Sequence, residues 1–179
     1  MKSHLVRTAQ VVIMLVSFSI ISMSCQREDP SETLTNGMRA FNNKNYEEAL
    51  VLFSKAIEMY PYFAEPYCLR ARTHYKMENY EEAISDYTEC IDYDPNNADA
   101  YYWRGKAYYY LEDYSNAISS YNKAIELDPD NIYYLYSRGS SYFLRDKNND
   151  IFYAINDFRK GCELGDNSAC KMLKDLMER

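Results

Sequence analysis

From residue 30 onward, small and bulky apolar residues recur four and then three positions apart. Tyr101, Gly105 and Tyr108 have this spacing, and similar sets appear before and after them. Residues at i, i+4 and i+7 lie on one face of an α-helix, and polar residues fill the other faces. No segment alternates with a period of two, so the pattern predicts an all-α protein without a sheet.

The helical pattern itself repeats every 34 residues. Residues 45–49 read Asn-Tyr-Glu-Glu-Ala, the same five letters return at 79–83, and a related set stands at 113–117. Pro61, Pro95 and Pro129 keep the same offset, and proline ends helices. The repeat divides the chain into units at 30–63, 64–97, 98–131 and 132–165, with an insertion of three residues near 147–150 in the last unit.

This 34-residue pattern of small, aromatic and proline positions resembles the tetratricopeptide repeat (TPR) family. The resemblance implies an α-solenoid of four helix hairpins over residues 32–179, with residues 166–179 as a capping helix. In that helix we expect Cys170, Leu173 and Met177 to face inward and Lys171, Lys174, Asp175 and Glu178 to face water. Gly37, Ala71, Gly105 and Gly139 would face Ala49, Ala83, Ala117 and Ala154 where paired helices cross. Asn45 and Asn79 stand three residues before Glu48 and Glu82, which predicts capping boxes at the second helices.

The first 24 residues have a different character. Lys2 and Arg7 precede an apolar run from Val11 to Ile21, which predicts a secretory signal. A permanent transmembrane helix is the alternative, but polar residues shorten the apolar span. Small residues before Cys25 resemble the lipobox of bacterial lipoproteins, which implies a lipidated Cys25 and a short linker over 25–31. The alternative is that Cys25 only lies near a cleavage site.

Charge limits the possible partners. The chain has 27 acidic and 20 basic residues, a net charge of −7, and loss of 1–24 would leave 18 basic residues and a net charge of −9. Such a surface argues against nucleic acid, whose phosphates need a basic face. We therefore expect attachment to a membrane through the lipid, in a bacterial cell envelope and at the outer membrane. Both the periplasmic side and the surface side of that membrane stay open.

Two pairs of cysteines remain. Cys162 and Cys170 are separated by seven residues, as in the Sel1-like repeats of secreted proteins, and this resemblance implies a Cys162–Cys170 disulfide; two buried free thiols are the alternative. Cys90 takes a small packing position, so we interpret it as a buried apolar residue. A metal site of Cys68, Cys90 and His74 is disfavoured because His74 takes a position held by tyrosine in later units.

In TPR proteins the first helices line a concave groove in which partners bind. The expected groove residues in this sequence are Leu34, Met38, Phe41, Cys68, Arg72, Tyr75, Tyr102, Lys106, Tyr109, Tyr133, Tyr136, Ser140 and Phe143. Arg72 and Lys106 would place positive charge among tyrosines, which are strong interface residues. Tyr67, Tyr101, Tyr108 and Tyr142 are expected to pack against second helices instead.

No spacing of nucleophile, base or metal ligands appears in the sequence, so we expect no enzyme, no cofactor and no metal. A non-catalytic TPR adaptor or scaffold that binds a segment of a partner protein and assists assembly of an envelope complex is the leading interpretation. The alternative is a binding protein for glycan or peptidoglycan fragments, because tyrosine-rich surfaces also stack on sugars. The oligomeric state stays open.

Overall fold

The computed structural model describes residues 29–146 and 149–178, so the expected signal 1–24 and Cys25 lie outside it. The described part contains helices and no strands. These helices are α2 Pro30–Asn42, α3 Tyr46–Met59, α4 Ala64–Lys76, α5 Tyr80–Tyr93, α6 Ala98–Tyr110, α7 Tyr114–Leu127, α8 Ile132–Arg145, α9 Ile151–Glu163 and α10 Asn167–Met177. None of them has both the length and the apolar character needed to cross a bilayer.

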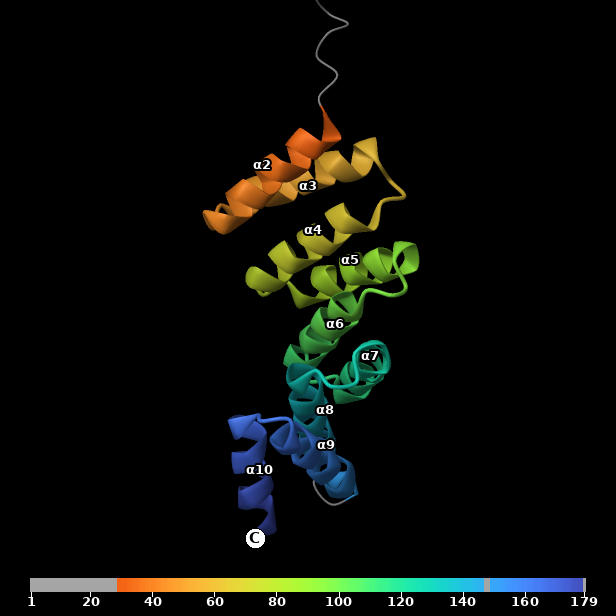
Figure 1. The fold of residues 1–179 in the computed structure, drawn as a ribbon. Helices are drawn as coiled ribbons and strands as arrows, with labels where there is room; N and C mark the ends of the chain where they lie inside the picture. Colours follow the sequence, from red (N-terminus) through yellow and green to blue (C-terminus); the bar gives the residue numbers. More distant parts are fainter. Residues whose placement is uncertain (1–28, 147–148, 179) are drawn as a thin grey trace, which may run out of the picture.

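The helices form four hairpins that stack into an elongated solenoid, with α10 packed on α9 at the end (Figure 1). Each helix contacts the next one along the chain, and the first helices α2, α4, α6 and α8 also contact one another in sequence. The four first helices therefore form one continuous side of the molecule. The sequence-based fold, an all-α solenoid of four hairpins with a capping helix, is confirmed.

The turn inside each of the first three hairpins uses one residue in the left-handed region. Lys44, Glu78 and Glu112 have φ of 64°, 63° and 60°, at the 34-residue interval of the repeat. The predicted capping boxes are wrong, because the side chains of Asn45 and Asn79 accept no hydrogen bond from the helices they precede. Asn45 instead donates to Glu48 Oε2 at 3.4 Å. Both helices still begin directly after these asparagines, with a tyrosine and two glutamates in the first turn.

Small residues sit where the paired helices cross, as the sequence predicts. Ala83 and Ala117 are fully buried, and a Cβ built on Gly105 would lie only 2.6 Å from the ring of Tyr121. A Cβ built on Gly37 would lie at the same distance from the ring of Phe53. Glycine is needed at these two crossings because the partner aromatic ring occupies the space that a methyl group would take.

Each of the helices α4, α6 and α8 carries an arginine whose side chain hydrogen-bonds to two other helices. Arg70 donates to both carboxylate oxygens of Asp86 at 2.7 Å and to Ser54 of the preceding hairpin at 3.0 Å. Arg138 makes the same pattern with Asp157 and Asn122. Hydrogen bonds between an arginine and a carboxylate are strong and directional, so these side chains fix the angle between successive hairpins.

The four cysteines in the described part of the chain are paired in two disulfides. Cys162 and Cys170 join α9 to α10, with their Cα atoms 4.6 Å apart. Cys68 and Cys90 join α4 to α5, with their Cα atoms 5.3 Å apart. The expectation of an unpaired, purely apolar Cys90 is therefore wrong. In an antiparallel hairpin that sets Ala71 against Tyr87, residue 68 falls opposite residue 90, and both cysteines point to the same crossing.

The capping helix differs from the sequence-based expectation in one respect. Leu173 and Leu176 pack on the last apolar cluster, whereas Met177 is 72% exposed. We expected Met177 to face inward, but the chain reaches the end of α10 there and Leu176 occupies the inner position. Lys174 and Glu178, which we expected in solvent, pair with each other at 3.7 Å on the outer face.

Candidate partner-binding groove

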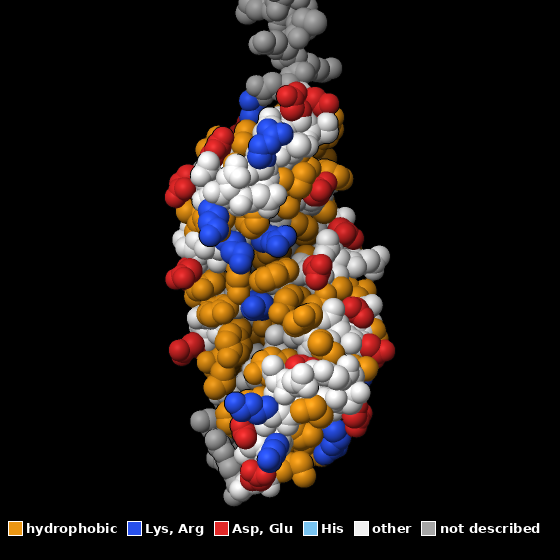
Figure 2. Space-filling view, turned by 60° about the vertical axis from the view of Figure 1, so that its left-hand side comes forward, with side chains coloured by type: hydrophobic (Ala, Val, Ile, Leu, Met, Phe, Trp, Pro, Cys, Tyr) orange, Lys and Arg blue, Asp and Glu red, His pale blue; other side chains and the backbone are white. Residues whose placement is uncertain are grey.

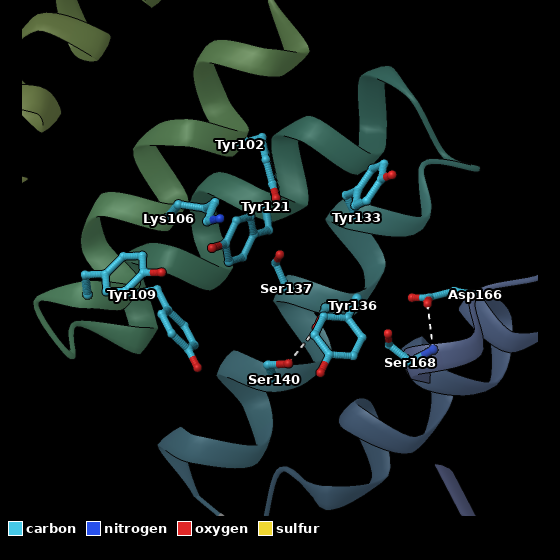
Figure 3. A pocket seen from close by; sticks show the side chains of 11 residues that line it. Tyr102, Lys106, Tyr109, Tyr121, Tyr133, Tyr136, Ser137, Ser140, Asp166 and Ser168 are labelled. Carbon is cyan, nitrogen blue, oxygen red and sulfur yellow. Dashed lines mark hydrogen bonds between the residues drawn. The ribbon is translucent and has the colours of Figure 1, made fainter. Parts of the chain in front are cut away.

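The candidate site lies on the side of the solenoid formed by the first helices. A pocket of about 320 Å³ opens between α6 and α8. Six predicted groove residues line it: Tyr102, Lys106, Tyr109, Tyr133, Tyr136 and Ser140. Figure 3 shows these side chains directed toward one shared space, with Tyr133 across from Tyr121. We call this space the tyrosine pocket.

Lys106 projects from α6 into a ring of aromatic side chains. Its Nζ atom lies 5.1 Å from the ring centre of Trp103, 5.8 Å from Tyr102 and 5.9 Å from Tyr75. No carboxylate of the described residues pairs with Lys106 or with Arg72. Aromatic faces attract a cation but do not replace a carboxylate partner, so the Lys106 ammonium group can still pair with a group of a bound partner.

Arg72 occupies a separate, smaller pocket. This space of about 190 Å³ lies between α4 and α6, and Tyr87, Asn97 and Trp103 also line it. The Arg72 guanidinium carbon lies 5.4 Å from the ring centre of Phe41, so the predicted residues Phe41 and Arg72 are brought together. Met38 and Phe41 pack beside the buried Phe53. We call this space the arginine pocket.

Tyr75 is the predicted groove residue whose surroundings differ most from the expectation. Its side chain is buried, 9% exposed, beneath Trp103 at 5.1 Å and Tyr110 at 5.9 Å between ring centres. A partner would meet Trp103 and Lys106 first. Tyr75 therefore supports the floor between the two pockets, because the indole ring of Trp103 covers it.

Several residues of the tyrosine pocket were not expected. Ser137 on α8, with Asp166 and Ser168 at the start of α10, completes its lining. Asp166 accepts a hydrogen bond from the backbone N–H of Ser168 at 2.9 Å, which caps α10 and fixes the carboxylate at one end of the pocket (Figure 3). The sequence signal was available, since Asp166 precedes a helix in the position of an N-cap.

Charge is distributed unevenly over this face. Figure 2 shows hydrophobic side chains along its middle with Lys and Arg among them, while most Asp and Glu side chains lie toward its edges. Burial raises the pKa of Tyr102 and Tyr109, so both hydroxyls stay neutral hydrogen-bonding groups over the physiological range. The site therefore offers aromatic surface, neutral hydroxyls and two cations.

The described residues contain no group of three or more His, Cys, Asp or Glu side chains that would hold a metal ion. His74 lies beside Asp86, with Nε2 3.9 Å from Oδ2, and Asp86 is committed to Arg70. The groups that line the candidate site can form hydrogen bonds, ion pairs and stacking contacts.

Comparisons with known proteins agree with this architecture. A tetratricopeptide repeat family model matches residues 68–132. The structure of MamA residues 41 to the end from Desulfovibrio magneticus RS-1 is 27% identical, with a TM-score of 0.70, and the match covers 78% of this chain and 77% of that one. A crystal structure of MamA is 22% identical with a TM-score of 0.74, covering 83% of this chain and 85% of that one.

A third solved structure is the first TPR of Spaghetti (RPAP3), bound to the HSP90 peptide SRMEEVD. It is 27% identical, with a TM-score of 0.59, and the match covers 64% of this chain and 90% of that one. Among curated proteins, none matches the chain. The fold and these comparisons define a TPR-like helical solenoid, a class typically used as a non-catalytic protein-interaction scaffold.

Proposed function

We propose that this protein is a non-catalytic adaptor that binds an extended segment of a partner protein along its first helices and assists assembly of a cell-envelope complex. One observation carries the proposal: Arg72 and Lys106 lie among exposed and half-buried aromatic side chains with no described carboxylate paired to either. Cations and tyrosine rings that share one surface are groups that contribute strongly to binding at protein interfaces.

Dimensions support an extended partner. Four first helices about 10 Å apart span roughly 30 Å, which an extended chain of about nine residues covers. The TPR of Spaghetti (RPAP3) is bound to a seven-residue peptide, SRMEEVD, and the shared fold supports a similar use here. The tyrosines supply large contact area at low entropic cost.

Site-specific photo-cross-linking tests where the partner lies. A photoreactive amino acid placed at Tyr109 or Tyr136 of the full chain, in cells, is expected to give a cross-linked partner band. The matched control is the same amino acid at Glu126, which lies exposed on the second helix α7. Lys106→Glu should abolish the band at Tyr109. Cross-links of equal strength from Glu126, or a band that Lys106→Glu leaves unchanged, would exclude binding through this face.

The location of the adaptor is a separate part of the proposal. The apolar run before Cys25 and the small residues beside it support export and lipid attachment. Labelling cells with a clickable fatty acid should mark the wild-type chain and not Cys25→Ser. Equal labelling of both chains, or labelling of neither, contradicts the anchor and leaves the groove proposal standing.

Glycan binding remains a second candidate because the tyrosine pocket holds stacking rings together with Ser137, Ser140 and Asp166 as hydrogen-bonding groups. Trp103 is half-buried beside Lys106, so its fluorescence reports occupancy of either pocket. Titration with soluble peptidoglycan fragments should leave this fluorescence unchanged if the adaptor proposal is right. A saturable change that Tyr136→Ala removes would favour the glycan alternative.

A further inference from the structure

The Tyr87 hydroxyl group is buried without a hydrogen-bond partner. The side chain is 2% exposed, and its hydroxyl and the Nδ1 atom of His74 are the two buried side-chain polar atoms of the described residues that have no partner. A buried hydroxyl that lost its water and gained no bond costs free energy, and native proteins seldom keep one without a use. Tyr87 also lines the arginine pocket.

The repeat shows that this hydroxyl is not needed for packing. The equivalent residues are Phe53 and Tyr121, each 34 positions away, and Phe158, which lies 37 positions after Tyr121 because of the insertion in the last unit. A phenyl ring therefore fills the position in the first and fourth units. At Tyr121 the hydroxyl interacts with Ser137 of the following first helix. At Tyr87 the residue in the place of Ser137 is Trp103, and the hydroxyl is left without that partner.

The charged groups around the hydroxyl are Arg72 and Asp99. Asp99 accepts a hydrogen bond from the Tyr134 hydroxyl at 2.8 Å, so α8 already holds its carboxylate. Arg72 has an exposed side chain that contacts only the face of Phe41 among the interactions of the described residues. A guanidinium offers five N–H donors in a planar fork that suits a carboxylate.

We propose that the arginine pocket binds an internal aspartate or glutamate side chain of the partner segment, with its carboxylate held between the Arg72 guanidinium and the Tyr87 hydroxyl. This inference rests on the proposed adaptor function and names the chemistry of its partner. Binding requires the exposed Arg72 side chain to turn from Phe41 toward the carboxylate, and the side chains that line the pocket to move enough for the buried Tyr87 hydroxyl to donate to it. Trp103 then covers the methylene groups of the bound side chain.

Two features favour an internal residue over a chain terminus. The first-unit groove residues Leu34 and Met38 are apolar and pack against the cluster of Ala40 and Phe53, so they offer no charged or polar group to a terminal carboxylate. Lys106 lies one repeat beyond Arg72, about 10 Å away by the usual spacing of packed helices. An extended chain covers this span in about three residues. The preferred segment therefore carries two acidic residues about three positions apart.

Selection from a peptide library tests the inference. The full chain, in detergent micelles, is used to select random peptides displayed between two constant flanking sequences, so that no free terminus is offered. Enrichment of Asp or Glu at two positions about three apart is expected. The strongest peptide is then made with both ends blocked, and its affinity for variants is measured by fluorescence anisotropy.

Tyr87→Phe is the decisive variant because phenylalanine already fills the equivalent position in two repeats. It should weaken binding by roughly tenfold to a hundredfold while Tm stays equal or rises, since one lost hydrogen bond to a charged group changes affinity by about this factor. Arg72→Gln should weaken binding by more than tenfold. Arg159→Gln, on the exposed surface of α9 and bonded to Asn156, is the matched control and should leave affinity unchanged.

The outcomes separate this inference from the adaptor proposal. Selected peptides without acidic residues would overturn the carboxylate site and leave peptide binding by the groove intact. Acidic peptides that bind wild type and Tyr87→Phe equally would overturn the assignment to this pocket. No selection of any peptide by the folded chain would overturn both.

Discussion

The second repeat (64–97) and the third (98–131) share backbone and register but differ in what secures them. The second has the Cys68–Cys90 disulfide and the Arg70–Asp86 ion pair. In the third, Arg104 has no carboxylate partner among the described residues: it donates to the hydroxyls of Ser120 and Thr88, both at 3.3 Å, and lies over the ring of Tyr101. The third repeat contributes side chains to the tyrosine pocket, namely Tyr102, Lys106 and Tyr109.

The comparison indicates that the same position of the repeat can stabilise the fold in one unit and line a binding surface in the next. Residue 68 is a cysteine that ties two helices, whereas its counterpart Tyr102 presents a ring to the pocket. In a solenoid each unit contacts only its neighbours, so a well-secured unit stabilises the adjoining unit that carries binding surface. We therefore expect substitutions in the second repeat to cost more stability than the matching substitutions in the third.

Removal of the second-repeat disulfide should have the largest effect. Cys68→Ala/Cys90→Ala is expected to lower the free energy of unfolding by about 3 kcal/mol, because the bridge closes a loop with a sequence separation of 22. Urea unfolding of the oxidised chain measures this. The control, Cys162→Ser/Cys170→Ser, opens a loop with a separation of 8 and should cost less. Equal or reversed costs would contradict the picture of a secured second repeat.

The ion pair should give the next largest effect. Asp86→Ala is expected to cost about 2 kcal/mol, because Arg70 loses two short hydrogen bonds and stays half-buried with its charge unpaired. Ser120→Ala, the matched change in the third repeat, should cost less than about 1 kcal/mol. Both values come from urea unfolding at neutral pH. A cost for Ser120→Ala as large as for Asp86→Ala would show that Arg104 is anchored equally well.

Exchange of the small residues at the helix crossings sharpens the comparison further. Ala71 packs on Tyr87 in the second repeat, whereas a Cβ on Gly105 would lie 2.6 Å from Tyr121. Gly105→Ala should therefore destabilise by about 1 kcal/mol, since the cost of overpacking exceeds the gain in helix propensity. Thermal unfolding measures the change. A stabilisation of about 1 kcal/mol would mean that the Tyr121 ring moves aside freely.

The smallest expected effect is a dependence of stability on pH. Burial lowers the pKa of His74, which Asp86 opposes in part, while the third repeat has Tyr108 at this position. The folded state therefore disfavours the protonated imidazole. The free energy of unfolding should fall as the pH drops through 6.5, the pKa of the imidazole in the unfolded chain. His74→Tyr should remove this part of the slope in urea midpoints between pH 7.5 and about 5.5. Identical slopes for both chains would exclude His74 as its source.

Much of the fold could be predicted from the 34-residue period, because helix faces, crossings and helix ends each leave a local pattern. The pairing of Cys68 with Cys90 could not be read from either helix alone, since it depends on the antiparallel register between them. The arginine series was also missed. Arg70, Arg104 and Arg138 keep the repeat offset, yet their partners lie 16 to 19 residues away on two different helices.

For the candidate site, the sequence identified Tyr102, Lys106, Tyr109 and Tyr136, because a fixed position in each repeat faces one side of the solenoid. It gave no means of knowing that Tyr75 would lie beneath Trp103, or that the start of α10 would close the tyrosine pocket. Those outcomes depend on the size of a neighbouring ring and on the path of the chain after the last repeat.

The sequence by itself determined that the chain forms stacked helix hairpins and which side of the stack carries tyrosines and cations, because both follow from periodic local choices. Only the tertiary structure decided that the cations divide between two pockets and that the Tyr87 hydroxyl is left without a partner. These features arise where side chains from different repeats compete for one space, and the outcome of that competition depends on distances that no single helix specifies.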